Sequence, residues 1–411
     1  MTKVKMEPAE VFACFAEINK IPRPSKKEEK MIEFLKNYGE KLGLETKVDE
    51  VGNVIIRKPA TKGYEDRETT VIQSHMDMVC EKDSNIEFDF MNDPINTEVD
   101  GEWLKAKGTT LGADDGIGVA MELAVLKDDS IEHGPLECVF TRDEETQLTG
   151  ASGMKSGFMT GKYLLNLDSE DEGEIFISCA GGASTKAVFH FNMEEAPKDY
   201  YFFKVGISGL TGGHSGDDIE KKRANANKLL VRFFYNEMKK FDLRISDIQS
   251  GGLHNAIPRD GWAVCAVPMK DKENIRIDAN VYVSEIEEEY SVTEKSLKFY
   301  VESADAADVI EKECAKKIIA SLQAVDNGVF AMSQDIDWLV ETSSNLASIH
   351  KNGNEIEIVT SQRSNIGSAR KNMSATVAAA FELGGAEVFT TDGYPGWKLN
   401  PDSELLKLAV D

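Results

Sequence analysis

Three features are scarce in this 411-residue sequence: long hydrophobic runs, paired cysteines and basic charge. The first stretch, MTKVKMEPAEVFACFAEINK, interrupts its hydrophobic residues with charges every few positions, so it predicts neither a signal peptide nor a membrane-spanning helix. The six cysteines include no C-x-x-C pair, which disfavours a cysteine zinc site and suits reduced thiols. We therefore expect a cytoplasmic protein with no membrane partner.

Acidic residues outnumber basic ones by 72 to 47, which leaves a formal net charge of −25. Such a charge repels nucleic acids and anionic membranes, so neither is an expected partner, whereas cations are favoured. A hydrophobic share of 41% indicates a folded protein. Because single cores seldom exceed about 250–300 residues, the length favours two domains.

The hydrophobic pattern changes along the chain. Residues 7–43 predict helices, and later segments predict strands (NVIIRK, TTVIQSH), a buried helix (GIGVAMELAVLKD) and strands again (LECVFT, YLLNLD). Strands that alternate with helices are typical of an α/β fold with a mostly parallel central sheet and helices on both faces. In such sheets, ligands bind beyond the carboxyl ends of the strands.

The middle of the chain predicts a second domain. From about residue 185 to 393 the pattern of strand, helix and strand occurs twice, which indicates an inserted α+β domain. The first domain would then comprise residues 1–184 and resume at 394–411, where Asn400 as N-cap and Pro401 predict a new helix.

One histidine and several acids stand directly after predicted strands. His75 and Asp77 follow one strand, Glu144 and Glu145 follow another, and Asp168 closes a third. Residues two apart in a strand share a face, so Asp77 is placed either to fix the tautomer of a metal-binding His75 or as a passive neighbour. Carboxylates with one imidazole suit zinc, manganese or cobalt, and a carboxylate that bridges two ions is typical of metal-assisted hydrolysis.

Each of these motifs also has an ordinary structural interpretation. Asp114 and Asp115, in TTLGADDGIG, suit an N-cap, and a Glu-Glu pair on a solvated loop is expected of a chain with 72 acidic residues. The pattern H-x-D is a weak signal when taken alone. The position of all these residues beyond strands of one sheet favours a metal site, because independent caps and loops have no reason to coincide there.

The strings SHMD, LGADDGIG, DEET and NLDSE, in that order, resemble the metallopeptidase family that includes carboxypeptidase G, the tripeptidase and the aminoacyl-histidine dipeptidases. The longer strings TLGADDGIG, TGASGM, LLNLDSEDEGEIFISCAGG and YPGW resemble the aminoacyl-histidine dipeptidase branch, also called cytosolic non-specific dipeptidases. The resemblance covers nearly the whole chain. It implies a zinc-peptidase-like catalytic domain with an inserted lid domain, and hydrolysis of Xaa-His and other dipeptides.

The resemblance also implies a role for each residue of the first domain. The implied metal ligands are His75, Asp114, Glu145 and Asp168. Asp114 would bridge two divalent ions, of which zinc is expected and manganese or cobalt are alternatives. Asp77 would orient His75, and Glu144 would act as the general base, a role that requires a carboxylate off the metals. The peptide bond between Asp114 and Asp115 is expected to be cis.

Three residues of the inserted domain are implied to contact the peptide. His214, in GLTGGHSG, would donate a hydrogen bond to the carbonyl oxygen that gains negative charge in the transition state. Asn255, in GGLHNAIPR, and Arg363, in SQRSN, would hold the dipeptide, with Arg363 pairing its free carboxylate.

Two other functions stay open: a related amidohydrolase such as an aminoacylase or deacylase, and a divalent-cation-binding protein without catalysis. A homodimer is also left open. The same family carries one more histidine ligand near its C-terminal end, on a segment similar to I-H-A-G-L-E, and no such string follows Asp168. We therefore expect an incomplete catalytic domain that binds metal weakly or at one site and has little dipeptidase activity until the missing region is supplied.

Overall fold

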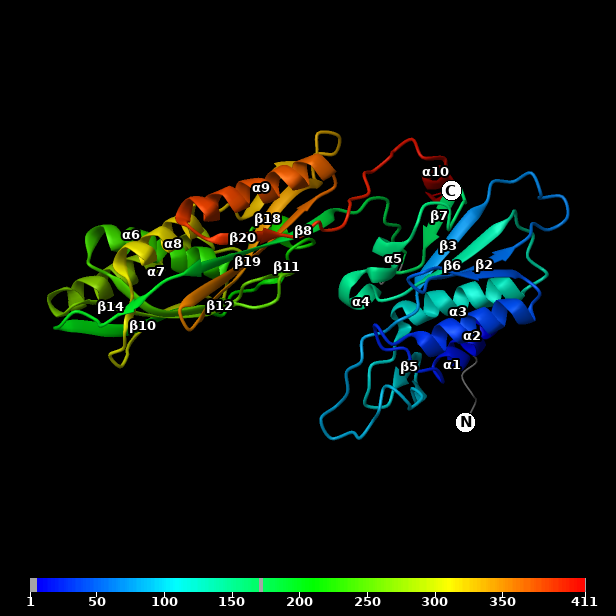
Figure 1. The fold of residues 1–411 in the computed structure, drawn as a ribbon, viewed down its shortest axis with the longest axis horizontal. Helices are drawn as coiled ribbons and strands as arrows, with labels where there is room; N and C mark the ends of the chain where they lie inside the picture. Colours follow the sequence, from blue (N-terminus) through cyan, green and yellow to red (C-terminus); the bar gives the residue numbers. More distant parts are fainter. Residues whose placement is uncertain (1–5, 170–172, 411) are drawn as a thin grey trace. The chain divides into compact units, whose positions relative to one another are not determined.

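The computed structural model describes residues 6–169 and 173–410, and the chain divides into two compact units (Figure 1). The first unit comprises Met1–Phe176 with Lys407–Asp411, and the second comprises Ile177–Leu406. Each unit has its own hydrophobic core. Among the described residues, no helix combines the length and the apolar character that crossing a membrane requires.

The first unit is built on a five-stranded sheet in the order β1-β2-β6-β3-β7. The strands are β1 (Glu45–Val48), β2 (Val54–Lys58), β3 (Thr70–His75), β6 (Leu136–Thr141) and β7 (Tyr163–Asn166). β3 pairs in parallel with β6 and β7, whereas β2 is antiparallel to both β1 and β6. The sheet is therefore mixed, and the expected parallel arrangement is found in the three strands that lead to the candidate site.

Three helices pack on one face of this sheet. They are α1 (Ala9–Ile18), α2 (Glu29–Lys41) and α3 (Ala113–Lys127). Side chains alternate between faces along β2 and β6, so Ile56 and Phe140 contact the helices, while Ile55 and Val139 pack on the opposite face with Phe158. The short elements of the unit are β4 (Thr97–Asp100), β5 (Trp103–Ala106), α4 (Glu144–Gln147) and α5 (Thr149–Gly153).

The last helix, α10 (Glu404–Val410), begins later than the sequence predicts. Asn400 and Pro401 precede the helix, and the Asn400 side chain accepts a hydrogen bond from the backbone N–H of Asp402, as in an Asx turn. Ser403 takes the N-cap position, because its Oγ accepts from the backbone N–H of Leu406. The prediction of Asn400 as N-cap is therefore wrong.

The second unit contains a nine-stranded sheet in the order β15-β10-β14-β12-β18-β19-β8-β20, with β17 paired to β18. The strands are β8 (Gly181–His190), β10 (Tyr200–Ser208), β12 (Arg244–Gly251), β14 (Gly261–Pro268), β15 (Lys298–Ser303), β17 (Gly328–Met332), β18 (Val340–Asn352), β19 (Glu355–Ser364) and β20 (Glu387–Thr390). All of these pairings are antiparallel. Two small ribbons lie outside the sheet, β9 (Met193–Glu194) with β16 (Val309–Ile310) and β11 (Gly213–His214) with β13 (Ala256–Ile257).

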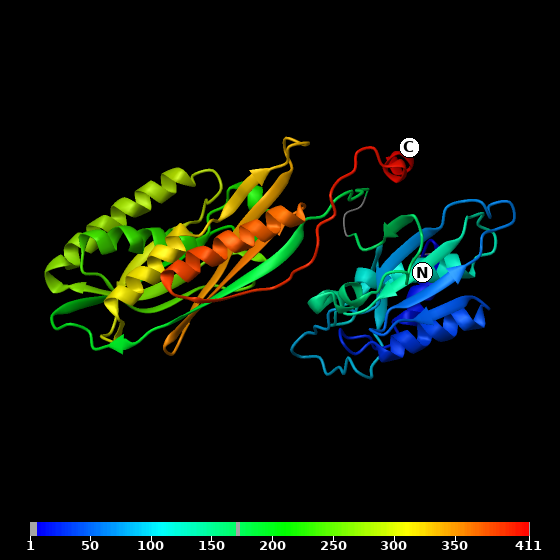
Figure 2. The same cartoon turned by 45° about the horizontal axis from the view of Figure 1, so that its top comes forward.

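Four long helices pack on one face of the large sheet (Figure 2). They are α6 (Ala226–Lys240), α7 (Lys272–Glu289), α8 (Lys312–Ala324) and α9 (Gly367–Gly384), and two short 3-10 turns accompany them, η1 (Ile219–Lys221) and η2 (Met269–Asp271). Phe189 of β8 meets Phe381 of α9 in the core, with ring centroids 6.3 Å apart. Helices and sheet thus enclose a large hydrophobic core, as expected of an α+β domain.

We predict that Phe381→Ala destabilises the second unit by about 3–5 kcal/mol, because it empties a fully buried site in the core. Leu383→Ala is the matched control, since this side chain of the same helix is 89% exposed and its loss should change stability by less than about 0.5 kcal/mol. Denaturant unfolding of both variants measures the difference. Equal midpoints for the two would contradict the placement of α9.

Candidate functional site

Three of the four predicted metal ligands converge at the carboxyl ends of β3 and β7 and the start of α3. Nε2 of His75 lies 2.8 Å from Oδ1 of Asp114 and 3.8 Å from Oδ1 of Asp168. One ligand atom from each of these residues lies within 4.8 Å of the other two. An imidazole and two carboxylates at this spacing form a donor set that fits a divalent cation such as zinc or manganese.

The charges around His75 also fit a cation. Burial by itself lowers the pKa of His75, but the contacts with Asp114 and Asp77 outweigh this effect and raise the pKa to about 11. The imidazole therefore lies in a strongly negative environment. A divalent cation would supply the positive charge that this environment favours.

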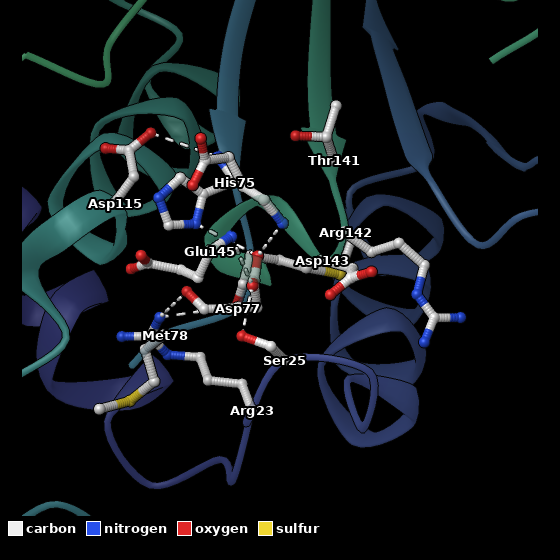
Figure 3. Close-up of polar contacts among 12 residues, drawn as sticks. Arg23, Ser25, His75, Asp77, Met78, Asp115, Thr141, Arg142, Asp143 and Glu145 are labelled. Atoms are coloured by element: carbon white, nitrogen blue, oxygen red, sulfur yellow. Dashed lines mark hydrogen bonds and ion pairs between the residues drawn. The ribbon is translucent and has the colours of Figure 1, made fainter. Parts of the chain in front are cut away.

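Asp77 is buried and contacts both His75 and the loop after β6 (Figure 3). Its Oδ1 lies 3.3 Å from Nδ1 of His75 and accepts a hydrogen bond from the backbone N–H of Glu144, and its Oδ2 accepts from the backbone N–H of Glu145. Burial raises the pKa of Asp77, but the contacts with His75 and Glu144 have a larger effect in the opposite direction. The pKa of Asp77 therefore lies below its ordinary value. Asp77 is thus an ionised carboxylate that fixes the imidazole and the following loop relative to each other.

Glu144 and Glu145 begin α4, directly after Asp143, whose φ of 52° lies in the left-handed region. The carboxylate of Glu145 lies outside the three-residue group, although burial and the charge of Asp114 raise its pKa. Burial raises the pKa of Glu144 to about 7, against the opposing effect of His75. Both carboxylates are therefore close enough to respond to the charges of the cluster.

The two aspartates at the start of α3 have different surroundings. Asp114 makes no cap hydrogen bond and contacts His75 instead. Asp115 is buried and accepts hydrogen bonds from the backbone N–H of Gly118 and of His75. The peptide bond between the two is cis, as the resemblance implies. The N-cap interpretation therefore suits Asp115 but not Asp114, and the sequence pattern does not reveal the contact of Asp115 with His75.

The second unit brings together the three residues expected to contact a peptide. The pairing of β11 with β13 places Asn255 beside the loop of His214, and the backbone N–H of Ser215 donates to the carbonyl oxygen of Asn255 at 2.7 Å. Arg363, in β19, has its Nη2 3.4 Å from Nε2 of His214. The side chains of His214 and Arg363, from segments far apart in the sequence, therefore form one polar site, and the backbone of Asn255 lies beside it.

Tyr394, from the string YPGW, belongs to the same site. Its hydroxyl lies 3.3 Å from Nη1 of Arg363. The ring lies against Gly182, where a Cβ atom would come within 2.8 Å of ring atoms. Arg370 donates hydrogen bonds to the backbone carbonyls of Tyr394 and Asp392 and so fixes this segment. The sequence motif alone gives no sign of these contacts, because they depend on how β8 and β19 pair.

Comparison with known proteins identifies relatives of the whole chain. Residues 71–410 match Peptidase family M20/M25/M40. The cytosol non-specific dipeptidase of Escherichia coli is 39% identical over 407 residues, which cover 98% of this chain and 84% of the relative. The crystal structure of aminoacylhistidine dipeptidase from Vibrio alginolyticus is also 39% identical, with a TM-score of 0.89 over 98% of this chain and 82% of that one. Aminopeptidase PepT from Bacillus cereus, at 19% identity and a TM-score of 0.51 over 97% of this chain and 80% of that one, shares the fold.

We predict that divalent cations stabilise the first unit through the cluster of His75, Asp114 and Asp168. Mn²⁺ or Zn²⁺ at about 100 times its Kd should raise the free energy of unfolding by about 2.7 kcal/mol, and His75→Ala should abolish most of this gain. The control is His190→Ala, an exposed histidine 3.1 Å from Glu355. Thermal unfolding with and without the ion measures the gain. An undiminished gain in His75→Ala would place the ion elsewhere.

Proposed function

Because the chain belongs to Peptidase family M20/M25/M40, we propose that it is a metal-dependent dipeptidase that hydrolyses Xaa-His and other dipeptides. The observation that carries the proposal is the convergence of His75, Asp114 and Asp168 in a chain whose two relatives of 39% identity bear dipeptidase names. The word "cytosol" in the name of the Escherichia coli relative supports a cytoplasmic location.

The metal ligands in this proposal are His75, Asp114, Glu145 and Asp168. Two divalent ions, zinc in the first place and manganese or cobalt as alternatives, would polarise the scissile carbonyl and lower the pKa of a water molecule. Asp77 would hold the tautomer and orientation of His75 through Nδ1. The negative charge of the cluster supports this assignment.

Glu144 is the proposed general base. A base must keep its carboxylate available to accept a proton, and its efficiency is greatest when its pKa lies near the working pH. The pKa of about 7 that burial imposes on Glu144 supports this role. The same carboxyl group would then return the proton to the leaving amine, which needs it to depart as a neutral amine.

The peptide is proposed to bind to His214, Asn255 and Arg363. Arg363 offers a guanidinium to the free carboxylate of a dipeptide, and His214 offers a ring N–H to the carbonyl oxygen. Their proximity within the second unit supports a common role, and the hydroxyl of Tyr394 adds a further donor beside Arg363. A free carboxylate is common to dipeptides and N-acyl amino acids, so this site by itself does not distinguish a dipeptidase from an aminoacylase.

We predict that Glu144→Gln retains bound metal and lowers kcat by about 10²- to 10⁴-fold, because the amide cannot accept the proton. Metal analysis and hydrolysis of a panel of Xaa-His, β-Ala-His, Gly-Gly and N-acetyl amino acids provide the measurement. Faster turnover of the N-acetyl amino acids by the unsubstituted protein would favour an aminoacylase, and two equivalents of bound metal without any turnover would favour a cation-binding protein.

We also predict that Arg363→Lys lowers kcat/KM for dipeptides by about 10- to 100-fold, because it removes a forked, charge-assisted contact with the carboxylate. Dipeptide amides, which lack that carboxylate, serve as the control substrates. The variant and the unsubstituted protein should cleave the amides equally well. An equal loss of kcat/KM on dipeptides and dipeptide amides would mean that Arg363 does not bind the substrate carboxylate.

A further inference from the structure

The polar segment Arg23–Glu28, which joins α1 to α2, contacts three loops of the candidate metal centre. These are the end of β3 with the residues that follow it (75–78), the N-cap and start of α3 (112–115) and the loop after β6 (142–145). We propose that this segment is the positioning element of the centre: it binds neither ion nor substrate but fixes the loops that do. The proposal deepens the proposed function and rests on it.

Arg23 ties two of the loops together. Its side chain is only 1% exposed, and its Nη1 donates to the carbonyl oxygen of Asp77 at 3.1 Å (Figure 3). Its Nη2 donates to the carbonyl oxygen of Gly112 at 2.6 Å. The backbone N–H of Met78 in turn donates to the carbonyl oxygen of Arg23 at 3.2 Å. One guanidinium thus spans the loops that carry His75 and Asp114.

The glycines of the LGADDGIG motif make room for this guanidinium. A Cβ atom at either Gly112 or Gly116 would come within 2.6 Å of Nη2 of Arg23. Gly112 also has a φ of 66°, a backbone conformation that residues with a side chain rarely adopt. Any larger residue at these positions would displace the Arg23 side chain, so the motif that carries Asp114 is shaped to fit the positioning segment.

Ser25 and Glu28 hold the third loop. Oγ of Ser25 donates to Oδ2 of Asp77 at 2.7 Å, the same oxygen that accepts from the backbone N–H of Glu145. Glu28, which is fully buried, accepts from the backbone N–H of Asp143 at 3.1 Å and pairs with Arg142 at 2.6 Å. Glu28 and Asp77 together therefore accept hydrogen bonds from the backbone N–H groups of three consecutive residues, at positions 143 to 145.

Glu28, Asp77 and Asp143 form a second group of close, buried carboxylates, but their oxygens already accept hydrogen bonds. Glu28 and Asp77 accept the bonds described above, and Asp143 accepts from the hydroxyls of Thr146 and Thr149. A cation at this position would have to displace these donors and leave them without their hydrogen-bond partners. The group therefore serves to anchor the loops rather than to bind an ion.

The proposal is tested by comparing hydrogen–deuterium exchange of the metal-free Arg23→Lys variant with that of the unsubstituted protein. Lysine keeps the positive charge but replaces the two terminal nitrogens of the guanidinium fork with a single ammonium group. Exchange should therefore quicken in peptides that cover 75–78 and 112–116, which Arg23 bonds directly, and in 142–146, which Asp77 connects to them. The matched control is Arg57→Lys, whose guanidinium bridges Glu137 and the carbonyl oxygen of Phe158 elsewhere in the same unit. That control should leave exchange at the three loops unchanged.

Titration with Mn²⁺ alone provides the second measurement. Arg23→Lys and Ser25→Ala should each weaken Mn²⁺ binding by about 10- to 100-fold, as is typical when the groups that orient metal ligands are lost, and Ser25→Thr should restore binding. Arg57→Lys should bind Mn²⁺ as the unsubstituted protein does.

Three outcomes would overturn the proposal: unchanged exchange at the three loops, faster exchange spread evenly over the first unit, or Mn²⁺ affinity within twofold of the unsubstituted protein. If the unsubstituted protein binds no Mn²⁺, the proposed function loses its metal centre. The exchange pattern then still decides whether Arg23–Glu28 positions these loops.

Discussion

The buried carboxylate of Asp77 is the contact on which the candidate metal centre depends. It faces the imidazole of His75, accepts hydrogen bonds from the backbone of Glu144 and Glu145, and receives the hydroxyl of Ser25. Because this carboxylate is buried away from water, it depends on these donors for compensation of its charge. The loss of any one donor would cost about 1–3 kcal/mol of stability. The geometry of several loops is therefore coupled through one side chain.

This coupling explains how a site with many like charges is compatible with a stable fold. The guanidinium groups of Arg23 and Arg142 lie close to a set of carboxylates that would otherwise repel one another. Burial lowers the pKa of Arg23 to about 10, so its guanidinium stays charged at neutral pH. In the second unit, Arg363 and His214 instead bring a guanidinium and an imidazole close together.

Much of the architecture could be predicted from the sequence, because strong periodicity and strand-end acids reflect local geometry. The segments TTVIQSH and LECVFT form the parallel pair β3 and β6, and the acids that follow them meet at one edge. The prediction of an N-cap at Asn400 was wrong, because Ser403 offers a hydroxyl at the turn that α10 uses. The sequence predicts the strand NVIIRK but not the reversed direction of β2, since strand direction depends on long-range pairing that periodicity does not encode.

The sequence by itself determined which chemistry is available: one histidine and several acids at strand ends, and a guanidinium and an imidazole in the inserted domain. Tertiary structure alone decided which of them meet. Arg23 reaches Asp77 and Gly112 because α1 and α3 pack against each other, and Tyr394 reaches Arg363 because β8 lies beside β19. Such contacts join residues that are 31 to 89 positions apart, so no local pattern of residues can report them.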